Sequence, residues 1–360
     1  MVSQSGELVA EVEKLNQKIE AAILPPELKE KAEEMVARVS RMARLGSYSA
    51  EYEQTARYID WICALPWTKR SEDILDLEYA KKALDKEHAG LAEIKSRVLE
   101  YLSVLKLKEE SASGQTSSSI AQKLMRAPIL CFVGLVGTGK TTMAYSISQA
   151  IGRKFVRIPF GGMGDVLYLR GQSKVFPDAE PGQIIKSLRK AGTKNPVILL
   201  DEIDRVAEEA RATIMGVLVE LLDPEQNQAF TDHYLDYPFD LSEALFIATC
   251  NNTGNLSTAV LDRLEPMQMP SYTDEDKLRI GRDFVLPKML EETGLTDVQL
   301  TIDEQVWPKI VRPLGYDAGI RTLERTINGI CRKIARMVIE GKGKDYHITE
   351  ANVKEFLPTW

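Results

Sequence analysis

The feature that most constrains this chain is a glycine-rich segment that directly follows a short apolar run at residues 127–133. The segment reads Gly134-Leu135-Val136-Gly137-Thr138-Gly139-Lys140-Thr141. This order fits the pattern G-x-x-x-x-G-K-[ST], and the helix-forming run at residues 142–151 supplies the context that the pattern requires. Glycines allow backbone torsions that residues with a Cβ resist, so the loop N–H groups can point inward. The sequence therefore predicts a phosphate-binding loop between a buried strand and a helix.

Each part of this loop suits a different part of a nucleoside triphosphate. Backbone N–H groups, together with the positive end of the following helix, would hold phosphate oxygens. Lys140 would reach the β- and γ-phosphates, and the Thr141 hydroxyl would hold Mg²⁺. Thr142 completes the nucleotide-binding set expected at residues 134–142. The alternative is an ordinary glycine-rich turn, which the flanking strand and helix disfavour. ATP or ADP with Mg²⁺ is the expected ligand.

Two adjacent carboxylates indicate that the chain hydrolyses the nucleotide as well as binding it. The apolar run at residues 196–200 is typical of a buried parallel strand, and Asp201-Glu202-Ile203-Asp204 follows it. Open α/β sheets bind ligands at the carboxyl ends of their strands. Asp201 is suited to the Mg²⁺ shell, and Glu202 to polarising an attacking water. A solvated acidic helix start is the alternative, because acidic residues favour helix N-termini.

Composition places the chain among globular proteins. Its 360 residues are enough for two or three domains, and 28% charged with 44% hydrophobic residues is ordinary for such proteins. A net charge of −7 argues against nucleic acid as the main partner. The first residues have no basic start or apolar core, and we expect no membrane span and a cytoplasmic location.

The cysteines are widely spaced along the chain. Cys131 and Cys250 lie inside apolar, strand-like runs, and Cys63 and Cys331 lie far from both. Small buried thiols are therefore expected, rather than disulfides or metal ligands.

Three zones follow one another along the sequence. Residues 1–70 show helical spacing with a break at Pro25-Pro26, and residues 75–107 are again helical. Within residues 71–270, strand-like runs at 128–133, 155–159, 196–200 and 244–249 alternate with helical ones, which predicts a doubly wound parallel α/β sheet. A polar, serine-rich stretch within 111–126 is typical of a flexible insertion. Residues 271–360 form a helical zone with a β-like tail at 345–348.

Longer strings in the chain resemble a known family. They lie at 58–61, 64–67, 85–91, 94–102, 152–158, 189–196, 222–227, 230–234 and 319–324. Their content and order resemble the ATPase module of the Lon protease family over residues 7–357. The resemblance implies an AAA+ P-loop NTPase fold, with a helical region before the nucleotide-binding domain and an α-helical lid after it.

The resemblance also implies roles for single residues. Asn251 matches sensor 1, which touches the γ-phosphate, and Arg321 matches sensor 2, which acts from the lid on its own subunit's nucleotide. Arg263 matches the arginine finger that acts on the neighbouring subunit, so the resemblance implies a ring, expected to be a homohexamer. Taken alone, a loop Asn and two surface arginines would be ordinary.

The pore loop of the family, which grips unfolded polypeptides through an aromatic residue, aligns with residues 171–182. Phe176 keeps the aromatic, whereas Pro177, Asp178 and Glu180 replace smaller or apolar neighbours. Proline stiffens a loop and the two carboxylates add negative charge, so a preference against acidic substrates is expected. Leu135-Val136 replace the usual prolines of the phosphate loop, and its Gly, Lys and Thr positions are unchanged.

The family's peptidase is not matched. No Ser/Lys or Ser/His/Asp arrangement in this chain has sequence support. Three functions stay open: an ATP-hydrolysing ring that unfolds or remodels proteins, with a separate protease as one partner; an excised ATPase module of an ATP-dependent Lon serine protease; and a nucleotide-gated scaffold with little turnover. The tail Pro358-Thr359-Trp360 favours a natural form without the peptidase.

Overall fold

The computed structural model describes residues 4–44, 50–112, 129–313 and 317–358. The chain divides into two compact units. The first comprises Met1–Leu75, Tyr101–Cys131 and Ile151–Pro266, and the second comprises Asp76–Glu100, Phe132–Ala150 and Met267–Trp360. The division predicted from the sequence, with boundaries near residues 70 and 270, stays a prediction. Within the described ranges, no helix combines the length and apolar character that crossing a bilayer requires.

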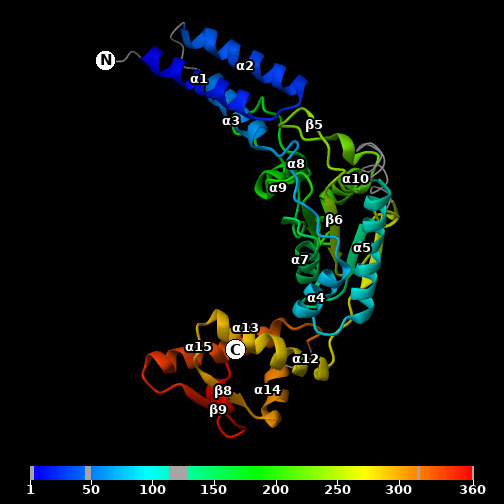
Figure 1. The fold of residues 1–360 in the computed structure, drawn as a ribbon, viewed down its shortest axis with the longest axis vertical. Helices are drawn as coiled ribbons and strands as arrows, with labels where there is room; N and C mark the ends of the chain where they lie inside the picture. Colours follow the sequence, from blue (N-terminus) through cyan, green and yellow to red (C-terminus); the bar gives the residue numbers. More distant parts are fainter. Residues whose placement is uncertain (1–3, 45–49, 113–128, 314–316, 359–360) are drawn as a thin grey trace. The chain divides into compact units, whose positions relative to one another are not determined.

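The N-terminal part of the first unit consists of three helices, α1 (Gln4–Ala21), α2 (Pro26–Arg44) and α3 (Ala50–Ala64). Pro26 begins α2, where its missing N–H is no loss and its fixed φ suits a helix. Leu15, Ile19, Leu28 and Ile59 are buried where the helices contact one another. Figure 1 shows α1 and α2 side by side. The helical prediction for this region, with its break at the proline pair, is confirmed.

A five-stranded sheet in the order β2-β3-β6-β1-β7 carries the α/β part of the fold. Its strands are β1 (Ile129–Val133), β2 (Phe155–Pro159), β3 (Val197–Asp201), β6 (Leu245–Cys250) and β7 (Leu264–Gln268). β3 runs parallel to both β2 and β6, with Val197 opposite Phe155 and Leu245. Every residue of β3 and β6 is buried, as continuous apolar runs predict for the centre of a parallel sheet.

The sequence prediction found four of these strands and missed β7. The β7 sequence Leu-Glu-Pro-Met-Gln contains a proline and a carboxylate, which disfavour a central strand. β7 lies at the edge of the sheet, where a missing N–H donor is tolerated.

Five further helices of the α/β region are α7 (Lys140–Ala150), α8 (Leu167–Arg170), α9 (Gln183–Ala191), α10 (Arg211–Leu222) and α11 (Thr258–Leu261). Two short strands, β4 (Phe230–Thr231) and β5 (Pro238–Phe239), form an antiparallel pair.

Residues 75–107, predicted as continuous helix, form two helices. α4 (Leu77–Glu87) begins at the Asp76 cap, and α5 (Ala92–Ala112) begins after a turn in which Gly90 and Leu91 have φ of +65° and +54°. Leu91 therefore precedes α5, whose buried face carries Ile94, Val98 and Leu102. Of the predicted insertion, residues 113–126 lie outside the described residues.

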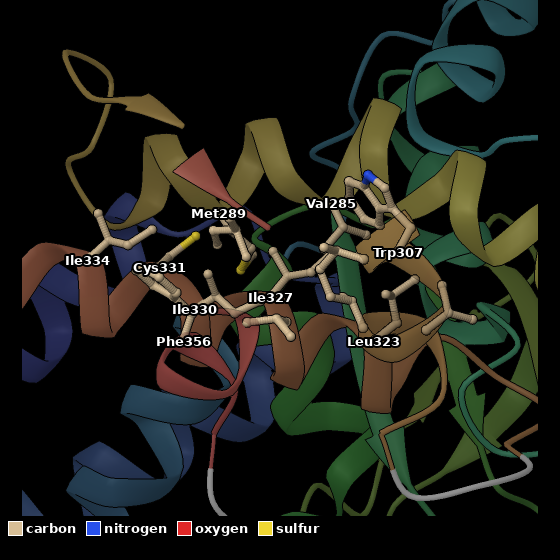
Figure 2. Packing of buried hydrophobic residues seen from close by; sticks show 14 of the residues in the cluster. Val285, Met289, Trp307, Leu323, Ile327, Ile330, Cys331, Ile334 and Phe356 are labelled. Atoms are coloured by element: carbon tan, nitrogen blue, oxygen red, sulfur yellow. The ribbon is translucent and has the colours of Figure 1, made fainter. Parts of the chain in front are cut away.

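The second unit contains the C-terminal lid. Its elements are α12 (Asp274–Ile280), a π-helical turn (Gly281–Val285), α13 (Leu286–Glu292), β8 (Gln299–Ile302), α14 (Trp307–Val311), α15 (Arg321–Ile339), β9 (Asp345–Ile348) and α16 (Val353–Phe356). Figure 2 shows Leu323, Ile327, Ile330 and Ile334 spaced along α15 within an apolar core that includes Trp307. β9 confirms the predicted β-like tail, and its parallel partner β8 was missed.

The buried-thiol prediction is confirmed for Cys131 on β1 and Cys250 on β6. Both residues are fully buried thiols, with their Sγ atoms 3.8 Å apart.

Candidate functional site

The glycine-rich segment of the second unit forms a tight loop between β1 and α7. Gly137 and Gly139 have φ of +84° and +89°, torsions that side chains rarely adopt, so glycine is required at both positions. Lys140 begins α7, and its Nζ donates hydrogen bonds to the carbonyl oxygens of Gly134 at 2.5 Å and Leu135 at 2.9 Å. The ammonium group therefore lies against the loop itself. This is the arrangement expected of a phosphate-binding loop.

Lid residues contact this loop within the same unit. The Ile320 N–H donates to the Gly137 carbonyl at 3.1 Å, and the Tyr272 hydroxyl donates to the Thr138 carbonyl at 3.2 Å. A Cβ built on Gly319 would lie 2.5 Å from the Gly137 carbonyl carbon. Arg321 is the first residue of α15 and follows these contacts directly. The second unit thus brings Arg321 and the phosphate loop together, as the sensor-2 prediction requires.

Gly319→Ala should weaken nucleotide binding about tenfold and lower the stability of the second unit by about 1–3 kcal/mol, because the new methyl group would overlap the loop backbone. Titration with a fluorescent ATP analogue and thermal unfolding measure the two effects. Gly216→Ala is the matched control, because no atom lies within 4 Å of its added Cβ. Unchanged affinity in Gly319→Ala would mean that the lid contact does not shape the loop.

The acidic strand end lies in the first unit, at the carboxyl end of β3. Asp201 is 3% exposed, and one of its carboxylate oxygens accepts a hydrogen bond from Arg157 Nε of β2 at 2.6 Å. Its other oxygen accepts the hydroxyl of the buried Thr249 of β6. The Thr249 oxygen in turn accepts the Glu202 N–H at 2.9 Å. Thr249 therefore fixes both carboxylate residues relative to the end of β6.

Glu202 has a strained backbone. Its φ is +58°, a left-handed torsion that is costly for a residue with a side chain and that is often found where function needs it. A Cβ built on Gly161 would lie 3.1 Å from Glu202 Oε2, so glycine at position 161 leaves room for the carboxylate. Arg205 Nη1 lies 3.7 Å from Glu202 Oε1. The strain and the open neighbour together support a chemical role for this carboxylate.

The other two residues predicted near the nucleotide also lie in the first unit. Asn251 directly follows β6, and the next residue, Asn252, donates its N–H to the buried carboxylate of Asp204 at 3.3 Å. Arg263 donates to Asp223 Oδ2 at 2.6 Å and to the Ala259 carbonyl at 2.8 Å. The Arg263 guanidinium lowers the pKa of the Asp223 carboxyl below its usual value. Arg263, the candidate arginine finger, is therefore paired with the Asp223 carboxylate of its own chain.

Three residues around these groups were missed by the sequence prediction: Arg157, Thr249 and Asp223. Arg157 is a charged residue between the buried Val156 and Ile158 of β2, and Thr249 is a polar residue inside an apolar strand, so each left a local signal. Asp223 left none that points to Arg263, because their contact joins positions 40 residues apart.

Phe176 lies in loop 172–181, which joins α8 to α9 through Gly171 and Gly182. Its side chain is 63% exposed, and that of Val175 is 78% exposed. The Asp232 carboxylate holds the base of the loop by accepting the N–H groups of Gly182 at 2.7 Å and Tyr234 at 2.8 Å, and burial raises the pKa of Asp232. A Cβ on Gly182 would lie 1.9 Å from the Leu169 carbonyl oxygen. The loop thus presents an apolar tip on a closely fixed base.

The residues present fit a nucleotide-bound Mg²⁺ better than a metal held by protein alone. No group of three or more His, Cys, Asp or Glu side chains among the described residues could hold a metal ion. Mg²⁺ normally keeps several waters and takes one or two carboxylates together with substrate phosphates. The Asp201 carboxylate in the first unit and the Thr141 hydroxyl in the second are donors of the required type.

Comparisons of the sequence with known proteins identify the family of the nucleotide-binding domain and of the lid. Residues 130–271 match the ATPase family associated with various cellular activities (AAA), and residues 291–347 match the Lon protease AAA+ ATPase lid domain. The chain is 43% identical to the Lon protease of Lawsonia intracellularis, over 96% of this chain and 40% of that protein. It is 43% identical to Lon protease 2 of Thermus thermophilus, over 96% of this chain and 42% of that protein. It is 42% identical to Lon protease 1 of Bacillus subtilis, over 96% of this chain and 43% of that protein.

The phosphate loop, the acidic strand end and the helical lid define a nucleotide-binding AAA+ ATPase with an α/β P-loop fold. The chain belongs to the Lon family and is an ATPase module of the Lon type. It spans about 40% of the length of the curated relatives it matches. The predicted family and fold class are both confirmed.

Proposed function

We propose that this chain binds ATP with Mg²⁺, hydrolyses it to ADP, and uses the energy to unfold or remodel polypeptides in the cytoplasm. The observation that carries the hydrolysis step is the strained Glu202 beside the buried Asp201 at the end of β3. Residues 134–142 would hold the phosphates, with Lys140 neutralising charge on the β- and γ-phosphates. Asp201 and Thr141 would hold Mg²⁺, which supplies charge neutralisation of the phosphoryl group during its transfer.

The reacting water would be oriented by the protein. The Glu202 carboxylate would accept a hydrogen bond from an O–H group of the attacking water and raise the nucleophilicity of that water. Asn251 would hold the same water and the γ-phosphate from the end of β6, and Arg321 would reach the nucleotide from the lid. Thr249 supports this role, because its hydroxyl donates to the Asp201 carboxylate and accepts the Glu202 N–H, and so links the two residues.

We further propose a homohexameric ring in which Arg263 acts on the nucleotide of the neighbouring subunit. An arginine supplied from another chain stabilises negative charge that develops in the transition state. The ion pair with Asp223 supports this proposal, because it would hold the guanidinium ready at one position before the subunits assemble.

The proposed substrate is an unfolded polypeptide gripped by Phe176. The adjacent exposed side chains of Val175 and Phe176 at the tip of loop 172–181 support this role, because contiguous exposed apolar surface, unlike a single apolar side chain, marks interaction sites. Proteolysis belongs to the relatives named above. For this chain we propose polypeptide handling that serves a peptidase, located either in the same protein or in a separate partner.

Basic unfolded polypeptides should stimulate the ATPase about threefold more than acidic ones at low salt, because loop carboxylates repel like charges in a confined channel. Asp178 and Glu180 line a hollow of about 400 Å³ together with Asp165, Tyr168 and Gln172, among others. Glu180 is paired with Lys186 at 2.5 Å, so Asp178 should carry most of the effect. Steady-state ATPase rates with matched acidic and basic chains at low and high salt measure it.

Asp178→Asn should remove most of this preference, and Glu180→Gln should change it less. The preference should also shrink at high salt, because screening shortens the reach of the charges. Equal stimulation by acidic and basic chains at low salt would contradict the charge argument. Full stimulation of Phe176→Ala would contradict the substrate-gripping role of the loop.

A further inference from the structure

We propose that helix α3 fixes the position of loop 172–181 through Arg57 and Lys174, and that these two residues position Phe176 for polypeptide-stimulated hydrolysis. The inference rests on the proposed gripping role of Phe176. It assigns to the N-terminal helices a part in handling the substrate. The contacts that carry it all lie within the first unit.

Arg57 supplies the first contact. Its Nη2 donates a hydrogen bond to the Pro177 carbonyl oxygen at 2.9 Å, across 120 positions in the sequence. Pro177 directly follows Phe176 and has no N–H of its own, so its carbonyl is the only backbone group it offers. Arg57 therefore holds the chain immediately beyond the exposed aromatic.

Lys174 supplies the second contact, on the other side of the tip. Its Nζ lies 4.4 Å from the centroid of the Tyr58 ring of α3 and 3.6 Å from Asp236 Oδ2. This ammonium is buried and makes no hydrogen bond, and desolvation lowers its pKa. Burying a cation without hydrogen bonds is unfavourable. The Tyr58 ring and the Asp236 carboxylate offset this cost, and they hold the Lys174 ammonium against α3.

Tyr58 is itself held firmly. It is 1% exposed, and its hydroxyl donates to the Leu235 carbonyl at 2.9 Å. Lys31 of α2 pairs with Asp236 at 2.9 Å, next to the Lys174 contact. The surface that receives the loop is thus formed by α2, α3 and the segment after β4.

The two contacts hold both sides of the exposed tip of loop 172–181 against helix α3. Val175 and Phe176 lie between Lys174 and Pro177, so both flanks of the exposed tip are tied to α3. Inside the loop, the Phe176 N–H bonds to the Ser173 carbonyl and the Ala179 N–H to the Phe176 carbonyl, which are turns of a few residues. The Gln172 N–H also donates to the Glu180 carbonyl at 3.1 Å and closes the loop at its base, so a polypeptide that pulls on the aromatic would pull on the whole loop. The contacts with α3 would transmit that pull to the body of the protein.

The test combines two measurements on the purified chain. Hydrogen exchange of the peptide covering residues 172–181 reports the order of the loop directly. The ratio of ATPase rates with and without an unfolded basic polypeptide reports coupling. The variants are Arg57→Ala, Lys174→Gln and the conservative Arg57→Lys. Lys18→Ala is the matched control, because it removes the ion pair between Lys18 of α1 and Asp60 of α3 without touching the loop.

Arg57→Ala and Lys174→Gln should each speed exchange in the loop about fivefold or more, the size expected for one lost hydrogen bond or its equivalent, and should lower the stimulation ratio by a similar factor. Arg57→Lys should restore part of both effects, since lysine can also donate to the Pro177 carbonyl. Lys18→Ala should change neither.

Unchanged loop exchange in Arg57→Ala and Lys174→Gln, or faster exchange with an unchanged stimulation ratio while Phe176→Ala abolishes stimulation, would overturn the inference. Stimulation that survives Phe176→Ala would instead overturn the gripping role of Phe176. The hydrogen-exchange result would then still show whether α3 orders the loop. The two failures are therefore distinguishable.

Discussion

Glu202→Gln should bind ATP with nearly unchanged affinity and lose at least about 100-fold in kcat, the usual contribution of a positioned general base. The amide keeps the size of the carboxylate and cannot accept a proton from water. The hydrogen bond that places this residue runs from the Glu202 N–H to the Thr249 hydroxyl, does not involve the side-chain carboxylate, and should survive the change. Steady-state ATPase assays and nucleotide titration measure the two quantities.

Glu209→Gln provides the control for this experiment. It removes an exposed carboxylate in the short helical turn Glu208–Ala210, a few residues after the site, and should leave kcat within about twofold, as surface substitutions usually do. Wild-type turnover in Glu202→Gln would exclude Glu202 as the base and would make Asp204, a buried carboxylate that follows it, the next candidate to test.

Arg263→Ala and Lys140→Ala should each lose nearly all ATPase activity, at least about 1000-fold for a missing arginine finger, and should recover activity when mixed. In a ring with head-to-tail interfaces, a random one-to-one mixture places an intact finger against an intact phosphate loop at half times half, or about a quarter, of the interfaces. The recovered rate should approach that fraction of the wild-type rate.

Two checks make the mixing experiment decisive. Thermal unfolding of Arg263→Ala shows whether loss of the partly buried ion pair with Asp223 disturbs the fold; fully exposed pairs are usually worth less than about 1 kcal/mol. Subunit exchange is followed with two fluorescent labels. Rings that exchange subunits and stay inactive would contradict action across an interface.

Much of the α/β fold was predictable because its signals are local. The strands β3 and β6 are apolar at nearly every position, and burial on both faces of a parallel sheet requires such a sequence. The phosphate loop was predictable because only glycine tolerates the torsions at positions 137 and 139. By contrast, the edge strand β7 contains a proline and a carboxylate, which obscure the apolar pattern by which a strand is predicted. The turn between α4 and α5 depends on a left-handed Leu91, which no propensity favours.

The contacts between site residues that are distant in the sequence could not be predicted from the sequence. The sequence suggested Asp201 and Glu202 through their place after an apolar strand, yet the residue that orients both, Thr249, lies on another strand. The pairing of Arg263 with Asp223 and the contact of Arg57 with Pro177 also depend on how distant segments pack. The family resemblance suggested which role each of these site residues has. The structure adds the partners through which this chain would perform them.

The most direct test of the account is the steady-state ATPase rate of the purified chain, with and without Mg²⁺ and an unfolded basic polypeptide, compared with that of Lys140→Ala. The account predicts Mg²⁺-dependent turnover that rises when the polypeptide is added and that disappears in Lys140→Ala. Tight ATP binding without turnover, or the same rate in Lys140→Ala as in the wild type, would contradict it.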